Sequence, residues 1–354
     1  MREFLENVPK AELHLHLRGA APAGFLDSLL AKYAPSQILE NAPVRHVELF
    51  RSCRHLAPFL ETQRFRRNQA AGLFGYQSFQ EFLITFLFTS YLFREIGDFR
   101  ALIQAVRREL SSQKIVYAEI TVSVVEYVNQ GLALDDILDV LDETAAAPGV
   151  RIRWIVDLVR NIGPEPALNL LRDILDRKPA HVAGITLGGS EDQFPPALFA
   201  QTYRLARDHG LRLTVHAGEA LGPESVWDAL RVLGAERIGH GVRSIEDQRL
   251  VAHLAEHAIP LEICPTSNLR TGLYSSYGEH PVRALYEAGV PISINTDDPS
   301  FFGTTLVSEY EHLLRNGFLE EDILVLLRNG FRHAFLPRNE KQGWLDQLDR
   351  SREA

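Results

Sequence analysis

The stretch KAELHLHLRGA (10–20) decides the fold and points to the chemistry. Its leucines alternate with polar residues, among them His14 and His16. Successive side chains of a β-strand point to opposite faces, so the two histidines share one face and the leucines take the other. The pattern predicts a strand that packs its leucines against outer helices and turns two imidazoles toward an interior.

Seven further β-rich runs follow this one along the chain. Together with 10–17, they are 115–122, 151–159, 182–189, 211–219, 237–241, 259–268 and 290–299. Helical patterns fill most of the gaps, such as PESVWDALRVLG (223–234) with its Pro-Glu start and its Gly stop. Eight alternating β and α units predict a parallel (β/α)₈ barrel. A Rossmann sheet is the alternative, but no GxGxxG motif follows the first strand.

The connection between the first and second strands is unusually long. Residues 20–111 are predicted to form a helical insert within a single domain that spans 1–354. Inside it, SFQEFLITFLFTSYLF (78–93) repeats phenylalanine at helical spacing, at Phe79, Phe82, Phe86 and Phe93. Packing inside a helical core explains most of these rings. A lid over the barrel mouth is the alternative, because long connections often have a function.

Bulk composition excludes several classes of protein. The net charge is 37 − 46 = −9, which disfavours a nucleic-acid-binding role. No apolar run is long enough to cross a membrane, and the N-terminus lacks the apolar stretch of a signal peptide. The cysteines, Cys53 and Cys264, form no CxxC pair, which excludes a cysteine-based zinc site and disfavours a disulfide framework. We expect a reducing, cytoplasmic compartment.

Polar groups gather where the later strands are predicted to end. TVHAGE carries His216 and Glu219, IGHG carries His240, and INTDDP carries Asp297 and Asp298. Each group alone has a plainer explanation as a core histidine, a helix start or a turn. With the first strand, however, four motifs at four strand ends all face one barrel mouth, where barrel active sites lie.

Three imidazoles and one carboxylate suit zinc or a similar divalent ion. Related two-metal barrel hydrolases bridge their ions with a carboxylated lysine on the fourth strand. The run VAGITLGGSE (182–191) offers Thr186 there and no lysine. The sequence therefore predicts one metal ion per chain.

The constellation closely resembles the adenosine deaminase family. The motifs PKAELHLHLRGA, LGGSE, HAGE, GHG, CPTSN and NTDDP stand in the family's order and spacing and span nearly the whole chain. The resemblance implies a purine nucleoside substrate and a zinc ion bound by His14, His16, His216 and Asp297. The apolar lid positions of the family match Phe82 and Phe86.

The resemblance also implies roles around the base. Glu219 would give and take a proton at N1 of the purine, and His240 would orient the activated water and stabilise its charge. Asp298 would hydrogen-bond N7, and the backbone N–H of Gly189 would reach N3.

The chemistry of deamination is consistent with these roles. Attack on an aromatic carbon requires a strong nucleophile, and bound zinc lowers the pKa of water to about 7. Attack at C6 puts charge on the ring, so a protonated Glu219 would quench it at N1, and an apolar pocket favours the protonated form. Ammonia then leaves. The other zinc deaminase signature, H-x-E with P-C-x-x-C, is absent.

Two positions depart from the adenosine enzymes, which carry acidic residues where this chain has Arg18 and Ser190. The acidic residue matching Arg18 contacts the ribose 5′-hydroxyl in that family. The substrate is therefore open: adenosine, a 5′-modified adenosine such as aminodeoxyfutalosine, an adenosine phosphate, or adenine. A catalytically silent family member that binds or signals is a further alternative, against which the intact ligand set and Glu219 argue.

Arg18 has two interpretations. A guanidinium matches a carboxylate or phosphate with two parallel hydrogen bonds, so Arg18 is a candidate for reading an anionic group at the 5′ end of a substrate. The plainer interpretation is an ion pair with a nearby carboxylate of the protein.

Overall fold

Eight parallel strands form the centre of the molecule, which a computed structural model describes over residues 1–40, 42–62 and 69–353. Each strand is hydrogen-bonded to the next in chain order, and a parallel bridge between Leu15 and Asp297 brings the end of the eighth back to the first. The strands are β1 (Lys10–His16), β2 (Ile115–Val122), β3 (Arg151–Asp157), β4 (Val182–Thr186), β5 (Arg212–Ala217), β6 (Arg237–His240), β7 (Leu261–Ile263) and β8 (Ile292–Ile294). The predicted (β/α)₈ barrel is confirmed.

The last strands are shorter than the sequence predicts. The runs 259–268 and 290–299 are strands only over Leu261–Ile263 and Ile292–Ile294. Pro265 and Pro299 each stand at the start of a helix soon afterwards, where proline is well tolerated because the first helical N–H groups have no helical partner. Asp297 and Asp298 therefore lie between the end of β8 and α16 at the barrel mouth, whereas Glu262 and Ser293 remain in the strands.

Helices surround the strands. Those that follow β2 to β7 are α8 (Val124–Asn129), α9 (Leu134–Ala146), α10 (Pro164–Arg177), α11 (Ala200–Asp208), α12 (Pro223–Asp228), α13 (Gln248–Glu256), α14 (Pro265–Arg270) and α15 (Val282–Glu287). After β8 come α16 (Pro299–Phe302), α17 (Leu306–Arg315), α18 (Glu320–His333) and α19 (Arg338–Glu353), while α1 (Arg2–Asn7) precedes β1. None of the helices described is long and apolar enough to cross a lipid bilayer.

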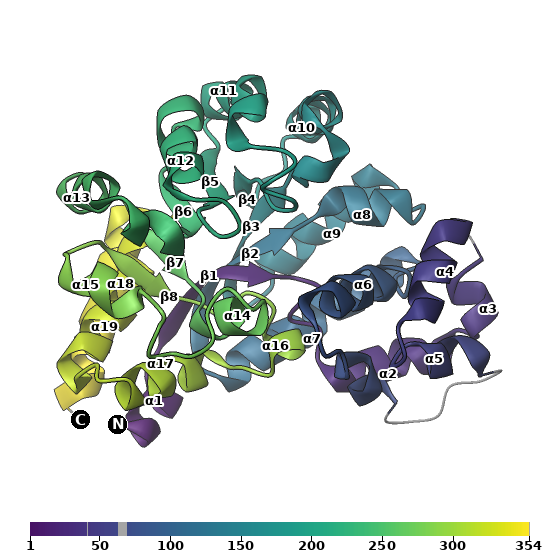
Figure 1. The fold of residues 1–354 in the computed structure, drawn as a ribbon, viewed down its shortest axis with the longest axis horizontal. Coiled ribbons are helices and arrows are strands. Elements are labelled where there is room, and N and C mark those ends of the chain that lie inside the picture. The colour runs from purple at the N-terminus through teal and green to yellow at the C-terminus, as the bar shows by residue number, and fades with distance from the viewer. Residues whose placement is uncertain (41, 63–68, 354) are drawn as a thin grey trace.

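The insert between β1 and β2 is helical, as predicted. It contains α2 (Ala23–Lys32), α3 (Pro35–Ile38), α4 (Val44–Ser52), α5 (Ala57–Glu61), α6 (Phe79–Ser90) and α7 (Ile96–Ser112). Positions 41 and 63–68 of the predicted insert lie outside the described residues. Figure 1 shows α2 to α6 gathered at one side of the barrel.

The phenylalanine stripe of the insert is shorter than predicted. Phe82 and Phe86 of α6 both contact Phe301 of α16, with ring centroids 5.8 and 5.2 Å apart. Phe93, however, lies beyond the end of α6 and packs against Tyr127 of α8 in the main core. The helix ends because residues 91–93 turn, so Phe93 leaves the stripe.

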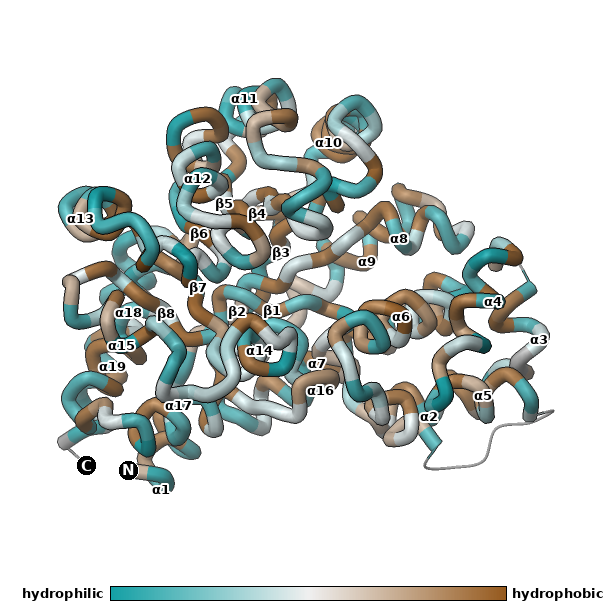
Figure 2. The backbone as a smooth tube through the Cα atoms, in the orientation of Figure 1, coloured by the Kyte–Doolittle hydropathy of each residue, from teal (hydrophilic) through white to brown (hydrophobic). Residues whose placement is uncertain are grey.

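The leucines of β1 are buried, as the alternating pattern predicts. Leu15, and Leu17 just after the strand, belong to the main core, and Leu13 packs in a smaller cluster that contains Phe331 of α18. Figure 2 shows hydrophobic segments along the strands and on α6. Their burial anchors β1 and leaves its histidines facing the barrel interior.

Candidate metal and purine site

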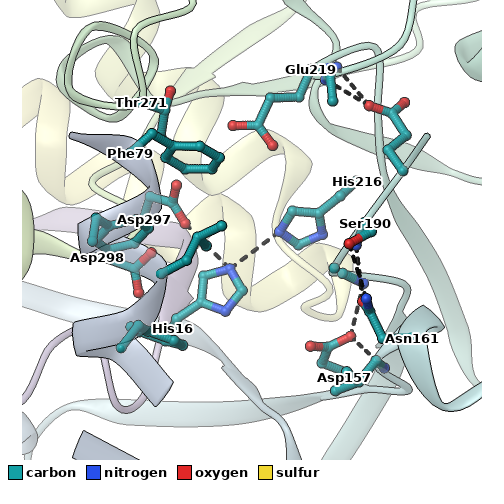
Figure 3. Close-up of a pocket in the computed structure, with 18 of the residues that line it drawn as sticks. His16, Phe79, Asp157, Asn161, Ser190, His216, Glu219, Thr271, Asp297 and Asp298 are labelled. Carbon is teal, nitrogen blue, oxygen red and sulfur yellow. Dashed lines mark hydrogen bonds and ion pairs between the residues drawn. The ribbon is translucent and has the colours of Figure 1, made fainter. Parts of the chain in front are cut away.

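Three histidines from β1 and β5 meet at the barrel mouth. One ligand nitrogen from each of His14, His16 and His216 lies within 4.8 Å of the others. The Nε2 atoms of His16 and His216 are 3.2 Å apart, and Oδ1 of Asp297 lies 3.2 Å from Nε2 of His16 and 3.5 Å from Nε2 of His14. Figure 3 shows His16, His216 and Asp297 pointing toward one another. The predicted ligand residues are therefore brought together.

The donor atoms of these side chains are of the kind that a metal ion binds. Nε2 of His14 is buried and, among the described residues, has no hydrogen-bond partner. Burial, with the neighbouring imidazoles, lowers the pKa of His216 well below its usual range and keeps the ring neutral, the form that binds metal. Three imidazoles and a carboxylate are a donor set that zinc accepts.

The backbone at Asp297 is held in an unusual conformation. Its φ is +63°, a left-handed value that costs a non-glycine residue about 1–3 kcal/mol and persists only where the surrounding structure imposes it. The Asp297 N–H donates to the carbonyl of His14, and the Ser267 hydroxyl donates to Oδ2 at 2.7 Å. These bonds fix the carboxylate relative to β1.

Hydrogen bonds at the Nδ1 atoms orient the rings of His14 and His216. Nδ1 of His14 lies 2.8 Å from a carboxylate oxygen of Glu262, and Nδ1 of His216 lies 3.1 Å from the Thr186 hydroxyl. Glu262 is itself paired with Arg237, which also contacts Glu119. We did not predict Glu262 from the sequence, although an acidic residue inside the apolar strand β7 was an available signal.

Cys264 also lies close to this group. Its sulfur can approach the ligand atoms of His14 and Asp297 within 4.8 Å. Burial raises the pKa of the Cys264 thiol well above its usual range, whereas a thiolate is the form that binds metal. A protonated thiol is a poor metal ligand, so the imidazoles and Asp297 are the better candidates although Cys264 lies near them.

Glu219 and His240 face the same space. Nε2 of His240 lies 3.6 Å from Oε2 of Glu219 and 3.8 Å from Oδ2 of Asp297. His240 has a left-handed backbone, with φ of +60°, and its Nδ1 lies 3.2 Å from the Asn268 amide. Removal from bulk water raises the pKa of Glu219, which favours the protonated carboxylic acid. The pair is arranged for proton transfer beside the candidate metal ligands.

Glu191 holds the loop that carries Glu219. Its carboxylate accepts hydrogen bonds from the backbone N–H groups of Gly218, Ala220 and Leu221 at 2.7–2.9 Å. Glu191 is the last residue of the LGGSE motif, but the sequence did not predict this role. Its position at a strand end was the available signal.

Asp298 projects against Gly19. A Cβ at Gly19 would lie 1.7 Å from Oδ1 of Asp298, so this position accepts only glycine with the carboxyl in place. Burial, with the neighbouring Asp297 carboxylate, raises the pKa of Asp298 well above its usual range. A protonated Asp298 could donate a hydrogen bond, as an acceptor nitrogen on a purine requires.

Gly189 and Ser190 line the opposite wall. Gly189 has φ of +101°, and a Cβ there would lie 2.1 Å from Oδ1 of Asn161. Asn161 exchanges two hydrogen bonds of 2.9 Å with Ser190, one to the hydroxyl and one from the backbone N–H. A side chain at position 189 would therefore break the wall that Asn161 and Ser190 form.

A single cavity of about 770 Å³ is lined by His16, His216, Glu219, His240, Asp297, Asp298, Gly189 and Ser190. Its volume lies within the range of about 300–1,000 Å³ that is typical of small-molecule sites. Phe82 and Phe86 form part of an apolar side that also includes the half-exposed Phe79 and Leu83.

Arg18 lines the cavity too, but its guanidinium is already paired. Its two terminal nitrogens donate to the two carboxylate oxygens of Glu126, at 2.5 and 3.1 Å. The ion pair with a nearby carboxylate, the plainer of the two interpretations of Arg18, is present in the structure.

Comparison with known proteins agrees with this geometry. The family model described as adenosine deaminase matches residues 9–351. The chain belongs to the adenosine deaminase family. An aminodeoxyfutalosine deaminase of Streptomyces avermitilis is 36% identical over 356 residues, which cover 99% of this chain and 92% of that protein. An adenine deaminase of Sinorhizobium fredii is 33% identical, covering 97% of this chain and 98% of that protein.

A solved structure gives the same result for the fold. The adenine deaminase of Arthrobacter aurescens superposes with a TM-score of 0.83 at 26% identity, over 98% of this chain and 100% of that chain. The protein is therefore an enzyme, a deaminase of the aminohydrolase type, and its relatives include proteins named for adenine-containing compounds.

Proposed function

We propose that this deaminase uses one zinc ion to hydrolyse the 6-amino group of an adenine nucleoside, releasing ammonia. The observation that carries the proposal is the convergence of His14, His16, His216 and Asp297 at the barrel mouth, beside the cavity that Glu219 lines. His14, His16, His216 and Asp297 would hold the ion, which when bound supplies the Lewis acidity that activates water at neutral pH.

The protein side chains supply the proton transfers. Protonated Glu219 donates to N1 of the purine as the nucleophile adds at C6, which removes negative charge from the ring. His240, 3.6 Å from Glu219, orients the attacking water and stabilises its charge. The Glu219 carboxylate then takes the two protons of the water in turn, passing one to the departing amine and keeping the other, so that C6 retains the oxygen and ammonia leaves. Asp298 donates to N7, the Gly189 N–H reaches N3, and Phe82 and Phe86 cover the base as an apolar lid.

The size of the cavity supports a nucleoside as the substrate. A free purine base would leave much of the 770 Å³ unfilled, whereas a sugar and a 5′ substituent would occupy it. The 36% identity to an aminodeoxyfutalosine deaminase makes that 5′-modified adenosine the first candidate, with adenosine as the second. The exposed Phe79 and Leu83 side chains of α6 offer an apolar surface to an aryl group at the 5′ end.

Ammonia release tests the substrate. Purified enzyme is assayed with aminodeoxyfutalosine, adenosine, adenosine 5′-monophosphate and adenine, and kcat/KM is compared. We expect the nucleosides to exceed adenine. The highest kcat/KM on adenine, or no turnover of any of the four, would overturn the proposal.

Elemental analysis tests the metal. We expect about one zinc ion per chain, loss of activity with a chelator, and recovery when zinc is restored. Two tightly bound ions per chain that are both needed for activity would contradict the mononuclear site.

A further inference from the structure

The two members of the Arg18–Glu126 pair differ in what they expose. The Arg18 side chain is 3% exposed, whereas the Glu126 side chain is 28% exposed, and both line the cavity. The Arg18 guanidinium also lies over the Phe86 ring, 3.9 Å from its centre. Arg18 is therefore held between a carboxylate and an aromatic face, and Glu126 is the member that a bound molecule can reach.

Glu126 has acceptor capacity to spare. An ionised carboxylate offers about four lone-pair sites, and Arg18 uses one on each oxygen. The remaining sites can accept hydrogen bonds only from a donor. A phosphate or carboxylate brought to Glu126 would meet a like charge, and to reach Arg18 it would have to displace Glu126 from a bidentate pair.

The pair is also well placed relative to the reacting end of a purine. C6 and N9 lie on different rings, so a base that presents C6 to the metal ligands points its N9 substituent away from them. Arg18 follows the ligand His16 by two residues toward the mouth, and Glu126 comes from α8, which carries none of the ligands. The sugar is the part of a nucleoside that would meet this pair.

We infer that Glu126 is a specificity-determining residue that accepts a hydrogen bond from a sugar hydroxyl of the nucleoside. Arg18 is its positioning residue: it fixes the Glu126 carboxylate through two parallel hydrogen bonds and does not contact an anionic group of the substrate. This inference rests on the proposed function and names the part of the substrate that the pair reads.

A substrate series crossed with variants tests it. Wild type, Glu126→Gln and Arg18→Met are assayed for kcat/KM with adenosine and its 2′-, 3′- and 5′-deoxy analogues. With the wild type, we expect kcat/KM for the analogue that lacks the contacted hydroxyl to be roughly 10- to 100-fold lower than for adenosine. This is the usual effect of losing a hydrogen bond to a charged group. Glu126→Gln and Arg18→Met should lose a similar factor on adenosine and should no longer discriminate against that analogue.

Controls separate this role from a structural one. Glu287→Gln breaks an exposed pair with Arg283, whose side chains are 60% and 49% exposed, and should leave the whole substrate profile unchanged. Thermal unfolding and metal content are measured for every variant. Arg18→Lys, which keeps the charge but loses the bidentate geometry, should restore part of the discrimination.

The outcomes are distinct. Equal losses on all four nucleosides, or no loss on any, would reject the role of Glu126 while leaving the proposed function intact. A wild-type preference for adenosine 5′-monophosphate over adenosine that Arg18→Met abolishes would instead assign anion recognition to Arg18. A wild type that deaminates no nucleoside overturns both the inference and the proposed function.

Discussion

The imidazole of His14 lies between two acidic side chains and is hydrogen-bonded to one of them. Nδ1 lies 2.8 Å from Glu262 on β7, and Nε2 lies 3.5 Å from Asp297 after β8. A carboxylate behind a histidine fixes the tautomer that leaves the other nitrogen free to bind metal. The side chains of His14 and Glu262 are each only 2% exposed, so water does not compete for this contact.

Glu262→Gln should weaken metal binding by roughly 10- to 100-fold, the usual effect of losing such a partner. The amide keeps the shape but is a weaker acceptor for the imidazole N–H. Competition with a chromophoric chelator measures the zinc affinity. Glu143→Gln, which breaks the exposed pair with Arg100, is the matched control and should bind zinc as the wild type does. Equal affinity in Glu262→Gln and the control would contradict this role.

Glu219→Gln should lower kcat by at least roughly 10²- to 10⁴-fold, the typical contribution of a general acid–base group. The amide preserves the shape of the cavity wall but cannot deliver a proton to N1. Equilibrium binding of a purine product analogue and the zinc content should both stay close to wild type. A variant within a factor of a few of the wild-type rate would show that the proton comes from another group.

The strand pattern made the barrel and its site readable from the sequence. Alternation in ELHLHL fixes which face the histidines share, and barrel topology brings His216 and Asp297 to the same mouth without knowledge of any loop. Local rules therefore sufficed for residues on or beside strands. They also predicted the helical insert, but not that α6 stops at Ser90.

The residues that the sequence did not reveal act through long-range contacts. Glu262 reaches His14 across 248 positions of the chain, and Glu126 reaches Arg18 across 108. Neither contact follows from the periodicity of the sequence, because each depends on how loops and helices pack in three dimensions. The sequence left Arg18 open as a reader of a substrate anion or as a member of an ion pair within the protein, and only the packing of α8 shows that Glu126 is its partner.

Glu309 gives the protein a pH-dependent stability that is separate from catalysis. The carboxyl is fully buried and accepts hydrogen bonds from Thr304 and Thr266, and burial raises its pKa to about 7. Since the folded state holds this proton more tightly than the unfolded chain, the stabilisation is complete below the ordinary pKa of 4.5. It is lost as the pH rises through about 7, by up to roughly 3 kcal/mol at 1.36 kcal/mol per pKa unit.

Glu309→Gln removes this titration. The stability of the variant relative to the wild type, measured as the difference in their free energies of unfolding, should therefore be greater at pH 7.5 than at pH 5. Urea unfolding of the zinc-loaded proteins at both pH values measures the difference, and the comparison between variants cancels the pH dependence of zinc binding itself. A difference that is the same at both pH values would show that Glu309 does not titrate in this range.

Gly19→Ala should impair the handling of the base while leaving the metal in place. The new Cβ would lie 1.7 Å from Oδ1 of Asp298, so the carboxyl must move away from the position from which it would reach N7. Misplacing one charge-assisted or neutral hydrogen bond costs about 1–3 kcal/mol, which corresponds to a loss of roughly 5- to 150-fold in kcat/KM.

Gly24→Ala is the matched control, because a Cβ at Gly24 meets nothing within 4 Å. We expect Gly24→Ala to match the wild type in rate and zinc content, and Gly19→Ala to match it in zinc content alone. A normal rate in Gly19→Ala would mean that Asp298 does not contact the substrate from the position it holds in this structure.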